Sequence, residues 1–109
     1  MKENKLDKIT YSKDDLIREL SQKIHFSHND MKFMVDNLLE TILEILKQPK
    51  DIIRIEIRNF GIFEVKPTKA KSKARNPKTN EVIFVPAHKK VTFKPGKILR
   101  EELKKEWKI

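Results

Sequence analysis

Residues 66–82 read K-P-T-K-A-K-S-K-A-R-N-P-K-T-N-E-V, and the expected fold is organised around this segment. Over positions 66 to 81 its only apolar side chains belong to two prolines and two alanines, which bury too little surface to offset the entropy of ordering the backbone. Six side chains are basic and Glu81 is the single acid. Because strand-like sequences flank the segment, we expect a long hairpin arm that projects from a folded body. A basic arm needs an anionic surface to become ordered, and nucleic-acid backbone is the most obvious one.

The charge of the chain is unevenly distributed. The chain has 109 residues, which is typical of a single domain, and its formal net charge is +9. Residues 1–65 carry 11 basic and 12 acidic side chains, whereas residues 66–109 carry 14 basic and 4 acidic ones. We therefore expect a neutral structural part followed by a part that binds a polyanion. The hydrophobic content of 38% supports a modest core, and small cores often gain stability by oligomerisation.

Two classes of protein are disfavoured by the composition. The chain has no cysteine, which excludes a disulfide framework. Residues 1–11 are polar, lack an apolar signal core and are expected to form a loose tail. Alternatively, the tail adds a phosphate contact through Lys2, Lys5 and Lys8. No apolar run approaches the length of a membrane span. We therefore expect a soluble, cytoplasmic protein without a membrane partner.

Catalytic and metal-binding residues are not expected either. The three histidines, His25, His28 and His88, have no carboxylate cluster beside them, and His25 and His28 are better interpreted as loop residues than as metal ligands. Ser12 and Ser27 are explained by helix capping, and no glycine-rich loop is present to hold a phosphate. We expect a non-enzymatic protein without a cofactor, a metal or a small-molecule substrate.

Two capping patterns upstream of the arm predict two helices. Each begins with a serine that is followed three residues later by an aspartate, Ser12 with Asp15 and Ser27 with Asp30. Apolar residues then recur at spacings of three and four. The pattern predicts a helical hairpin over residues 12–48, whose second helix is apolar enough to face both its own sheet and a second subunit.

From residue 53 the apolar period changes from helical to alternating, which predicts a half-buried strand. Asn59 and Gly61 predict the turn that follows, because both residue types tolerate positive φ. After Pro95 and Gly96 a final amphipathic helix is expected. The fold class is α+β: an N-terminal αα-hairpin, a three-stranded antiparallel sheet over residues 52–65 and 82–94, the protruding arm over residues 66–81, and a short C-terminal helix over residues 97–108.

Pro77 lies where the arm must turn, and two interpretations of it remain open from the residues alone. Asn76 followed by Pro77 is a common way to begin a turn. Alternatively, the proline is an apolar wedge without a backbone donor, which the flanking cations carry to DNA. Inserted between base pairs in the minor groove, such a wedge unstacks one step and kinks the duplex.

Three segments resemble a known family. Residues 53–66 read I-R-I-E-I-R-N-F-G-I-F-E-V-K, residues 74–80 read A-R-N-P-K-T-N, and residues 91–100 read V-T-F-K-P-G-K-I-L-R. In this order they resemble the histone-like HU and integration host factor family of bacterial DNA-bending proteins, over residues 12–104. The resemblance implies an intertwined dimer, with itself or with a paralogue, whose two arms bend double-stranded DNA through the minor groove. It also implies a nucleoid-associated protein that organises or compacts the chromosome.

The resemblance implies a set of DNA-binding residues by position. Pro77 would intercalate, with Arg75 and Asn76 as its neighbours in the minor groove. The cations expected along the arm and on the body are Lys13, Arg54, Arg58, Lys66, Lys69, Lys71, Lys73, Lys78 and Lys97. Charge alone adds Lys89, Lys90 and Lys94 as phosphate contacts.

The chain departs from the family pattern at two turns and along the arm. Asn59 replaces the first glycine of the family's G-F-G turn, and Asn80 replaces the glycine after R-N-P-x-T. Asparagine is the next-best residue at positive φ, so both turns are expected to form. The ascending side of the arm is one residue longer, which predicts a bulge or an altered twist of the arm near Lys73 and Ala74.

Two functions of other kinds also fit a basic arm. One is an RNA-binding or ribosome-associated protein, whose basic extension needs no apolar tip and whose target is A-form. The other is a module whose arm docks on an acidic protein. Whether DNA would be bound with or without sequence preference stays open.

Overall fold

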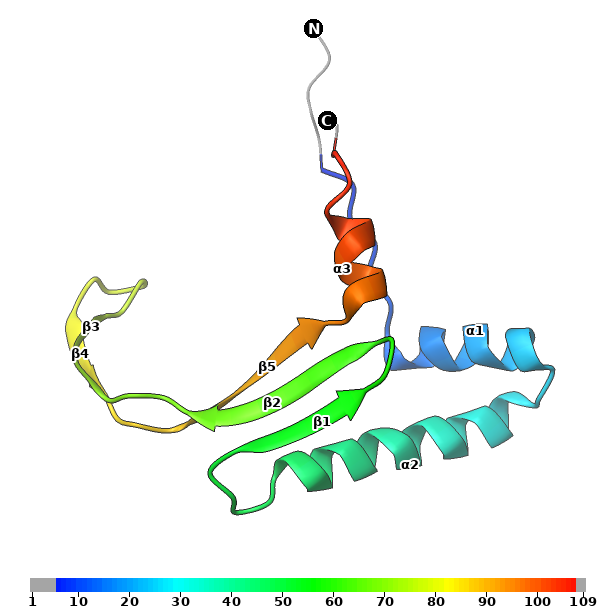
Figure 1. Ribbon diagram of the computed structural model, residues 1–109, viewed down its shortest axis with the longest axis horizontal. Coiled ribbons are helices and arrows are strands. Elements are labelled where there is room, and N and C mark those ends of the chain that lie inside the picture. Colours follow the sequence, from blue (N-terminus) through cyan, green and yellow to red (C-terminus); the bar gives the residue numbers. More distant parts are fainter. Residues whose placement is uncertain (1–5, 108–109) are drawn as a thin grey trace, which may run out of the picture. The chain divides into compact units, whose positions relative to one another are not determined.

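The computed structural model describes residues 6–107, with residues 71–74 described by their backbone (Figure 1). The described residues form two compact units: the first holds α1 and most of α2, and the second holds the strands and the last helix. The expected α+β fold class, with its helical hairpin and three-stranded antiparallel sheet, is confirmed. The elements are α1 (Lys13–Ile24), α2 (His28–Leu46), β1 (Ile53–Ile57), β2 (Gly61–Pro67), β3 (Lys71–Arg75), β4 (Val82–Val85), β5 (Lys89–Pro95) and α3 (Lys97–Leu103).

Both predicted helix caps form. The Ser12 Oγ accepts a hydrogen bond from the Asp15 amide at 3.2 Å, and the Asp15 carboxylate accepts one from the Ser12 amide at 2.9 Å. This capping box supplies partners for two donors that the first turn of α1 would leave unpaired. The Ser27 Oγ likewise accepts from the Asp30 amide at 3.1 Å at the start of α2. Between the helices His25 has φ 59°, the left-handed conformation that ends α1.

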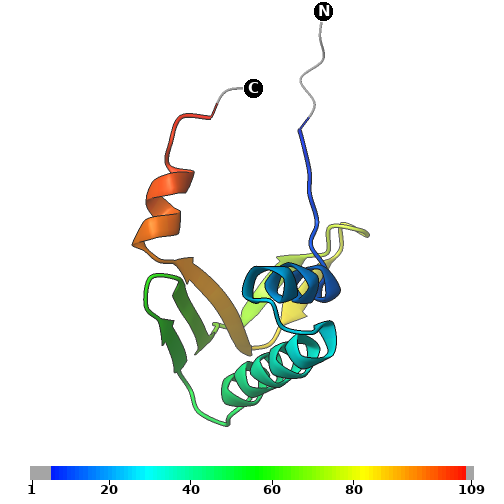
Figure 2. The same cartoon turned by 90° about the vertical axis from the view of Figure 1, so that its right-hand side faces the viewer.

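The helices α1 and α2 lie side by side and are joined by one ion pair and one hydrogen-bonded side-chain pair as well as by the tight link (Figures 1 and 2). Lys13 Nζ lies 2.8 Å from Asp36 Oδ1, and His28 Nε2 lies 3.2 Å from Asp14 Oδ1. Ile17 of α1 and Met31 of α2 are almost fully buried. The hairpin therefore has one fully buried apolar residue on each helix and polar bridges on its surface.

The main sheet has the strand order β1-β2-β5 and is antiparallel throughout. Asn59 has φ 67° in the turn between β1 and β2, as its sequence position predicted. A Cβ atom at Gly61 would lie 2.5 Å from the Lys94 carbonyl oxygen and 2.6 Å from the Phe93 ring, so the ladder with β5 requires glycine there. Phe93 also contacts the rings of Phe60 and Phe63, with centroids 5.5 and 4.9 Å apart.

A single chain buries few of its apolar side chains. Among the described residues, four hydrophobic side chains are buried: Ile17, Met31, Ile53 and Val65. Many large ones remain exposed, among them Leu38 on α2 at 59% and Phe60 at 52%. Monomeric soluble proteins rarely leave this much apolar surface open to water.

The arm begins and ends at different residues from those expected. We predicted that residues 82–94 would lie on the main sheet, but Val82–Val85 pairs with β3 in a separate two-stranded sheet, and β5 alone returns to β2. Pro86 explains the break, because it has no N–H to donate to a ladder. The paired part of the arm therefore extends to Val85.

The predicted bulge is present in the arm. Lys71 pairs with Val85, whereas Ala74 pairs with Ile83, so three steps along β3 correspond to two steps along β4. One extra residue on β3 is the arrangement of a β-bulge, which bends a ladder and increases its twist. The longer ascending side of the arm is thereby accommodated without loss of pairing at Arg75.

The last helix is shorter than predicted. It ends at Leu103 rather than near residue 108, which lies outside the described residues, and Lys104 caps it by donating to the carbonyl of Arg100 at 3.2 Å. Leu103 and Trp107 are 70% and 71% exposed. Most of the stability of a short helix comes from packing of its apolar face, and these side chains have no surface to pack against here.

Candidate nucleic-acid interface

The tip of the arm is a closed turn. The Asn76 amide donates to the Glu81 carbonyl at 2.8 Å, and the Asn80 amide donates to the Asn76 carbonyl at 2.6 Å. The Asn76 Oδ1 accepts a further bond from the Lys78 amide at 2.9 Å. Asn80 has φ 61°, as expected of the residue that stands in place of glycine. These bonds hold Pro77 at the corner of the turn, where it is exposed.

The expected neighbours of Pro77 differ in how many of their polar groups are used in hydrogen bonds within the turn. The Asn76 carbonyl, amide and side-chain oxygen are all used within the turn. The Arg75 guanidinium donates from Nη1 to the Asn80 Oδ1 at 3.0 Å. Lys78 is exposed beside them. The turn therefore combines a hydrogen-bonded apolar corner with cations on both sides.

Further cations follow the two sides of the arm toward the sheet. Lys66 and Lys69 are exposed on one side, and Lys89 and Lys90 on the other. Lys66 and Lys90 are direct partners across the β2–β5 ladder, so their charges lie on the same face. Lys89 Nζ instead donates to the Lys50 carbonyl at 2.8 Å. The side chains of Lys71 and Lys73 lie outside the described part of the chain, and their backbone forms part of β3.

A polar clamp joins the arm to the sheet, where neither ladder continues. The Thr68 amide donates to the His88 carbonyl at 2.7 Å, and the Thr68 Oγ1 donates to the same oxygen at 3.1 Å. The His88 amide donates back to that hydroxyl at 3.3 Å, and His88 Nδ1 lies 3.0 Å from the Pro86 carbonyl. His88 Nδ1 also lies 3.2 Å from the Thr68 Oγ1. This clamp keeps the two strands in register between Pro67 and Lys71.

One acid organises the polar face of the sheet. Glu64 lies on the central strand, its side chain is only 14% exposed, and three cations surround it. The distances from its carboxylate are 3.4 Å to Arg54, 3.7 Å to Lys66 and 3.9 Å to Lys94. Arg54 also reaches Glu56 at 3.3 Å. The predicted cations Arg54, Lys66 and Lys94 thus form one group around Glu64.

The two remaining body positions near the sheet lie at its turn end. Arg58 lines a surface hollow with Glu56, Asn59 and Gly96, between the β1–β2 turn and the start of α3. Lys97 begins α3 and lies 4.0 Å from Glu101 on the next turn. Both cations are exposed. They are at the opposite end of the sheet from the base of the arm.

Lys13 belongs to the first unit, where it is already paired. The Asp36 carboxylate accepts from Lys13 and from Lys32, at 2.8 and 2.6 Å, and these hydrogen bonds lower the pKa of Asp36. The hydrogen bond from Lys32 to Asp36 also raises the pKa of Lys32. The Lys13 side chain is paired with Asp36 and is still 52% exposed to solvent.

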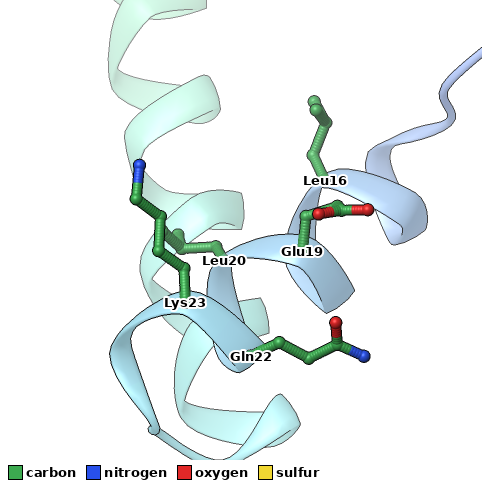
Figure 3. Close-up of a pocket in the computed structure, with 5 residues that line it drawn as sticks. All are labelled: Leu16, Glu19, Leu20, Gln22 and Lys23. Carbon is green, nitrogen blue, oxygen red and sulfur yellow. The ribbon is translucent and has the colours of Figure 1, made fainter.

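Neither a metal-binding group of side chains nor a membrane-spanning helix is found in the described part of the chain. Within residues 6–107 no three His, Cys, Asp or Glu side chains are grouped to hold a metal ion. A surface hollow at α1 is lined by Leu16, Glu19, Leu20, Gln22 and Lys23, whose side chains point in different directions (Figure 3). No helix in the described range is long and apolar enough to cross a membrane.

The structure reveals four side chains that sequence reasoning had not assigned to the interface. Glu64, Thr68 and His88 organise the cations and the base of the arm, and Asn80 had been considered only as a turn residue. The sequence carries a weak signal for the clamp, since Thr68 and His88 each lie next to or near a proline that ends a strand. The Glu64 cluster depends on cross-strand register, which sequence alone does not provide.

Comparisons with known proteins agree with this geometry. A family described as "Bacterial DNA-binding protein" matches residues 11–104. Integration host factor subunit alpha of Haemophilus influenzae is 42% identical over 96 residues, which are 88% of this chain and 96% of that protein. DNA-binding protein HU of Thermotoga maritima is 38% identical over 93 residues, which are 85% of this chain and 99% of that protein. The Anabaena HU–DNA cocrystal structure aligns with a TM-score of 0.74 and 29% identity, and covers 88% of this chain and all of that one.

The fold and its basic arm define a class, and the chain belongs to the bacterial DNA-binding protein family. Within that family it is similar to HU and to the subunits of integration host factor alike. The resemblance seen in the sequence is thereby confirmed. Membership of this family also confirms that the protein is not an enzyme.

Proposed function

We propose that this protein is an architectural DNA-binding protein that bends duplex DNA through the minor groove, with Pro77 as the intercalating residue. The observation that carries the proposal is the closed, exposed tip. Its hydrogen bonds hold the proline ring at the corner, and a proline has no N–H that would have to lose water on entering a base stack. A flexible tip would lose more entropy on insertion.

The cations supply the affinity in this proposal. Lys66, Lys69, Lys78 and Lys90 are exposed along the arm and its base, where they can follow a phosphate backbone. Each phosphate that a cation neutralises releases condensed counterions, so binding should fall steeply with salt. The wedge has a separate role: smooth bending of a site costs about 1–6 kcal/mol, and a local kink reduces that cost.

We further propose that two chains act together. Large apolar side chains, including Leu38, Leu43 and Phe60, are more than half exposed in the single chain. A second copy would cover such a surface, and two arms could then hold one duplex on either side of a bend. The partner is then this same chain, or a close paralogue with the same apolar surface. Bending and wrapping of this kind would organise or compact a chromosome, which makes the protein nucleoid-associated.

The test is energy transfer between fluorophores at the two ends of a duplex of about 35 base pairs, long enough to contain a bent site. The duplex is titrated with protein at low and moderate salt. We expect a saturable rise in transfer that weakens with salt. Pro77→Ala should reduce transfer at saturation more than it reduces affinity, because it removes the wedge and leaves the cations in place.

Lys78→Ala is the matched control, because it removes one charge from the same turn and leaves the proline. It should lower affinity while transfer at saturation stays near that of the wild type. Equal loss of affinity and of bending in both variants would contradict the assignment of Pro77. Tighter binding of duplex RNA than of duplex DNA would instead favour an RNA-binding protein, since A-form grooves suit different contacts.

A further inference from the structure

Asn80 has a side-chain contact that its backbone position does not require. Its φ of 61° is a conformation that glycine adopts with least strain. The hydrogen bond from its backbone amide to the Asn76 carbonyl involves no side-chain atom. Glycine could therefore form the same turn. The asparagine adds one specific interaction, because its Oδ1 accepts a hydrogen bond from Arg75 Nη1 at 3.0 Å.

This bond crosses the arm just below the proline. Arg75 is the last residue of β3 and pairs with Val82 across the hairpin, whereas Asn80 belongs to the descending side of the turn. An exposed arginine otherwise samples many rotamers and loses that freedom when it binds. The bond uses one N–H of a guanidinium that has several more, so the group is oriented and can still donate to a ligand.

We propose that Asn80 is a positioning residue that orients the Arg75 guanidinium beside the Pro77 wedge and so makes the arm tip selective for narrow minor grooves. Narrow grooves occur in A·T tracts, where their strong negative potential attracts an inserted arginine. A guanidinium held along the turn enters such a groove without first being ordered. This inference rests on the proposed function, because it assumes that the tip enters the minor groove.

The test compares affinities for two duplexes with the same central flexible step, one flanked by A·T tracts and the other by G·C pairs. The measured quantity is the ratio of the two dissociation constants, with bending recorded by energy transfer on the same samples. Asn80→Gly should lower the preference for A·T flanks about threefold, because Arg75 regains part of its rotamer freedom and must lose it again on binding. Bending at saturation should not change, because the wedge and the backbone turn remain.

Two further variants complete the design. In an Arg75→Ala background, Asn80→Gly should have no further effect on the ratio, because the group that it orients is gone. Thr79→Ala is the matched control: it alters the same turn, where the Thr79 hydroxyl accepts from the Glu81 amide at 3.4 Å, but leaves the Arg75 contact intact. It should leave the ratio unchanged.

The outcomes separate this inference from the function on which it rests. An unchanged ratio in Asn80→Gly, or an equal effect of that substitution with and without Arg75, would overturn the positioning role while bending by the wild type persists. An equal loss in Thr79→Ala would overturn it as well, since general disturbance of the turn would then explain the result. Failure of the wild type to bend either duplex would overturn the proposed function, and this inference with it.

Discussion

Replacing Glu64 by glutamine would remove the one acid at the centre of the polar face while keeping the shape of its side chain. The carboxylate lies 3.4 Å from Arg54, 3.7 Å from Lys66 and 3.9 Å from Lys94. Ion pairs with exposed partners contribute about 0.2–1 kcal/mol each. The three cations are about half exposed, so we take a total of about 1–2 kcal/mol for the cluster. Glu64→Gln should lower the free energy of unfolding by this amount.

The same substitution should strengthen DNA binding. In the wild type, phosphates must compete with Glu64 for the three cations, and part of the binding free energy is used to break those pairs. A gain of about 1 kcal/mol corresponds to roughly fivefold tighter binding. The dependence of affinity on salt should also steepen, by up to about 0.9 in the logarithmic slope for each cation that becomes free. Fluorescence anisotropy with a labelled duplex at several salt concentrations measures both quantities, and urea unfolding measures the stability.

Glu56→Gln is the matched control on the same face. Glu56 contacts Arg54 alone among these cations, at 3.3 Å, and its side chain is 66% exposed. It should change stability and affinity by clearly less than Glu64→Gln. If Glu64→Gln bound DNA no more tightly than the wild type, the three cations would not be in competition with phosphate. The polar face of the sheet would then not be part of the interface.

Two further predictions concern the clamp and the helical hairpin. Thr68→Val removes the hydroxyl that bonds to His88, so we expect faster amide hydrogen exchange in the arm and weaker DNA binding. The midpoint of thermal unfolding, followed on the main sheet, should stay that of the wild type. A large fall in this midpoint would contradict a role confined to the arm. The pKa of Asp36 is lowered in the folded state, so its pairs with Lys13 and Lys32 stabilise that state fully at any pH above the ordinary aspartate pKa of about 3.9. This stabilisation is lost as the pH falls through the lower pKa that Asp36 has in the folded state. Acid unfolding of Asp36→Asn should therefore show a weaker pH dependence below about pH 4 than that of the wild type, and identical profiles would contradict the assignment.

Much of the fold could be predicted because its signals are local. The capping box at Ser12 depends on residues three positions apart, and so does the bond from the Asp30 amide to Ser27. The positive φ of Asn59 and Asn80 follows from the few residue types that tolerate that conformation. The bulge in β3 was predictable from one extra residue between two recognisable segments. These features require no knowledge of what packs against them.

The errors fell at boundaries that depend on distant residues. Val82–Val85 has the apolar character of a sheet strand, yet it pairs with β3 in the arm, because Pro86 interrupts the ladder on its way back to β2. The helix predicted to residue 108 ends at Leu103, since an apolar stripe extends a short helix only when another surface covers it. Neither outcome can be decided from periodicity within one segment.

The sequence by itself determined the class of fold, the position of the arm, the placement of Pro77 at its turn and the concentration of positive charge in the second half of the chain. Only the tertiary structure decided which polar groups meet. The Glu64 cluster, the Thr68–His88 clamp and the Arg75–Asn80 bond each join residues on different strands or on opposite sides of a turn. Their formation depends on strand register, and a shift of one residue would send every side chain to the other face. That register is set by the pairing of β1, β2 and β5 and by the bulge in β3.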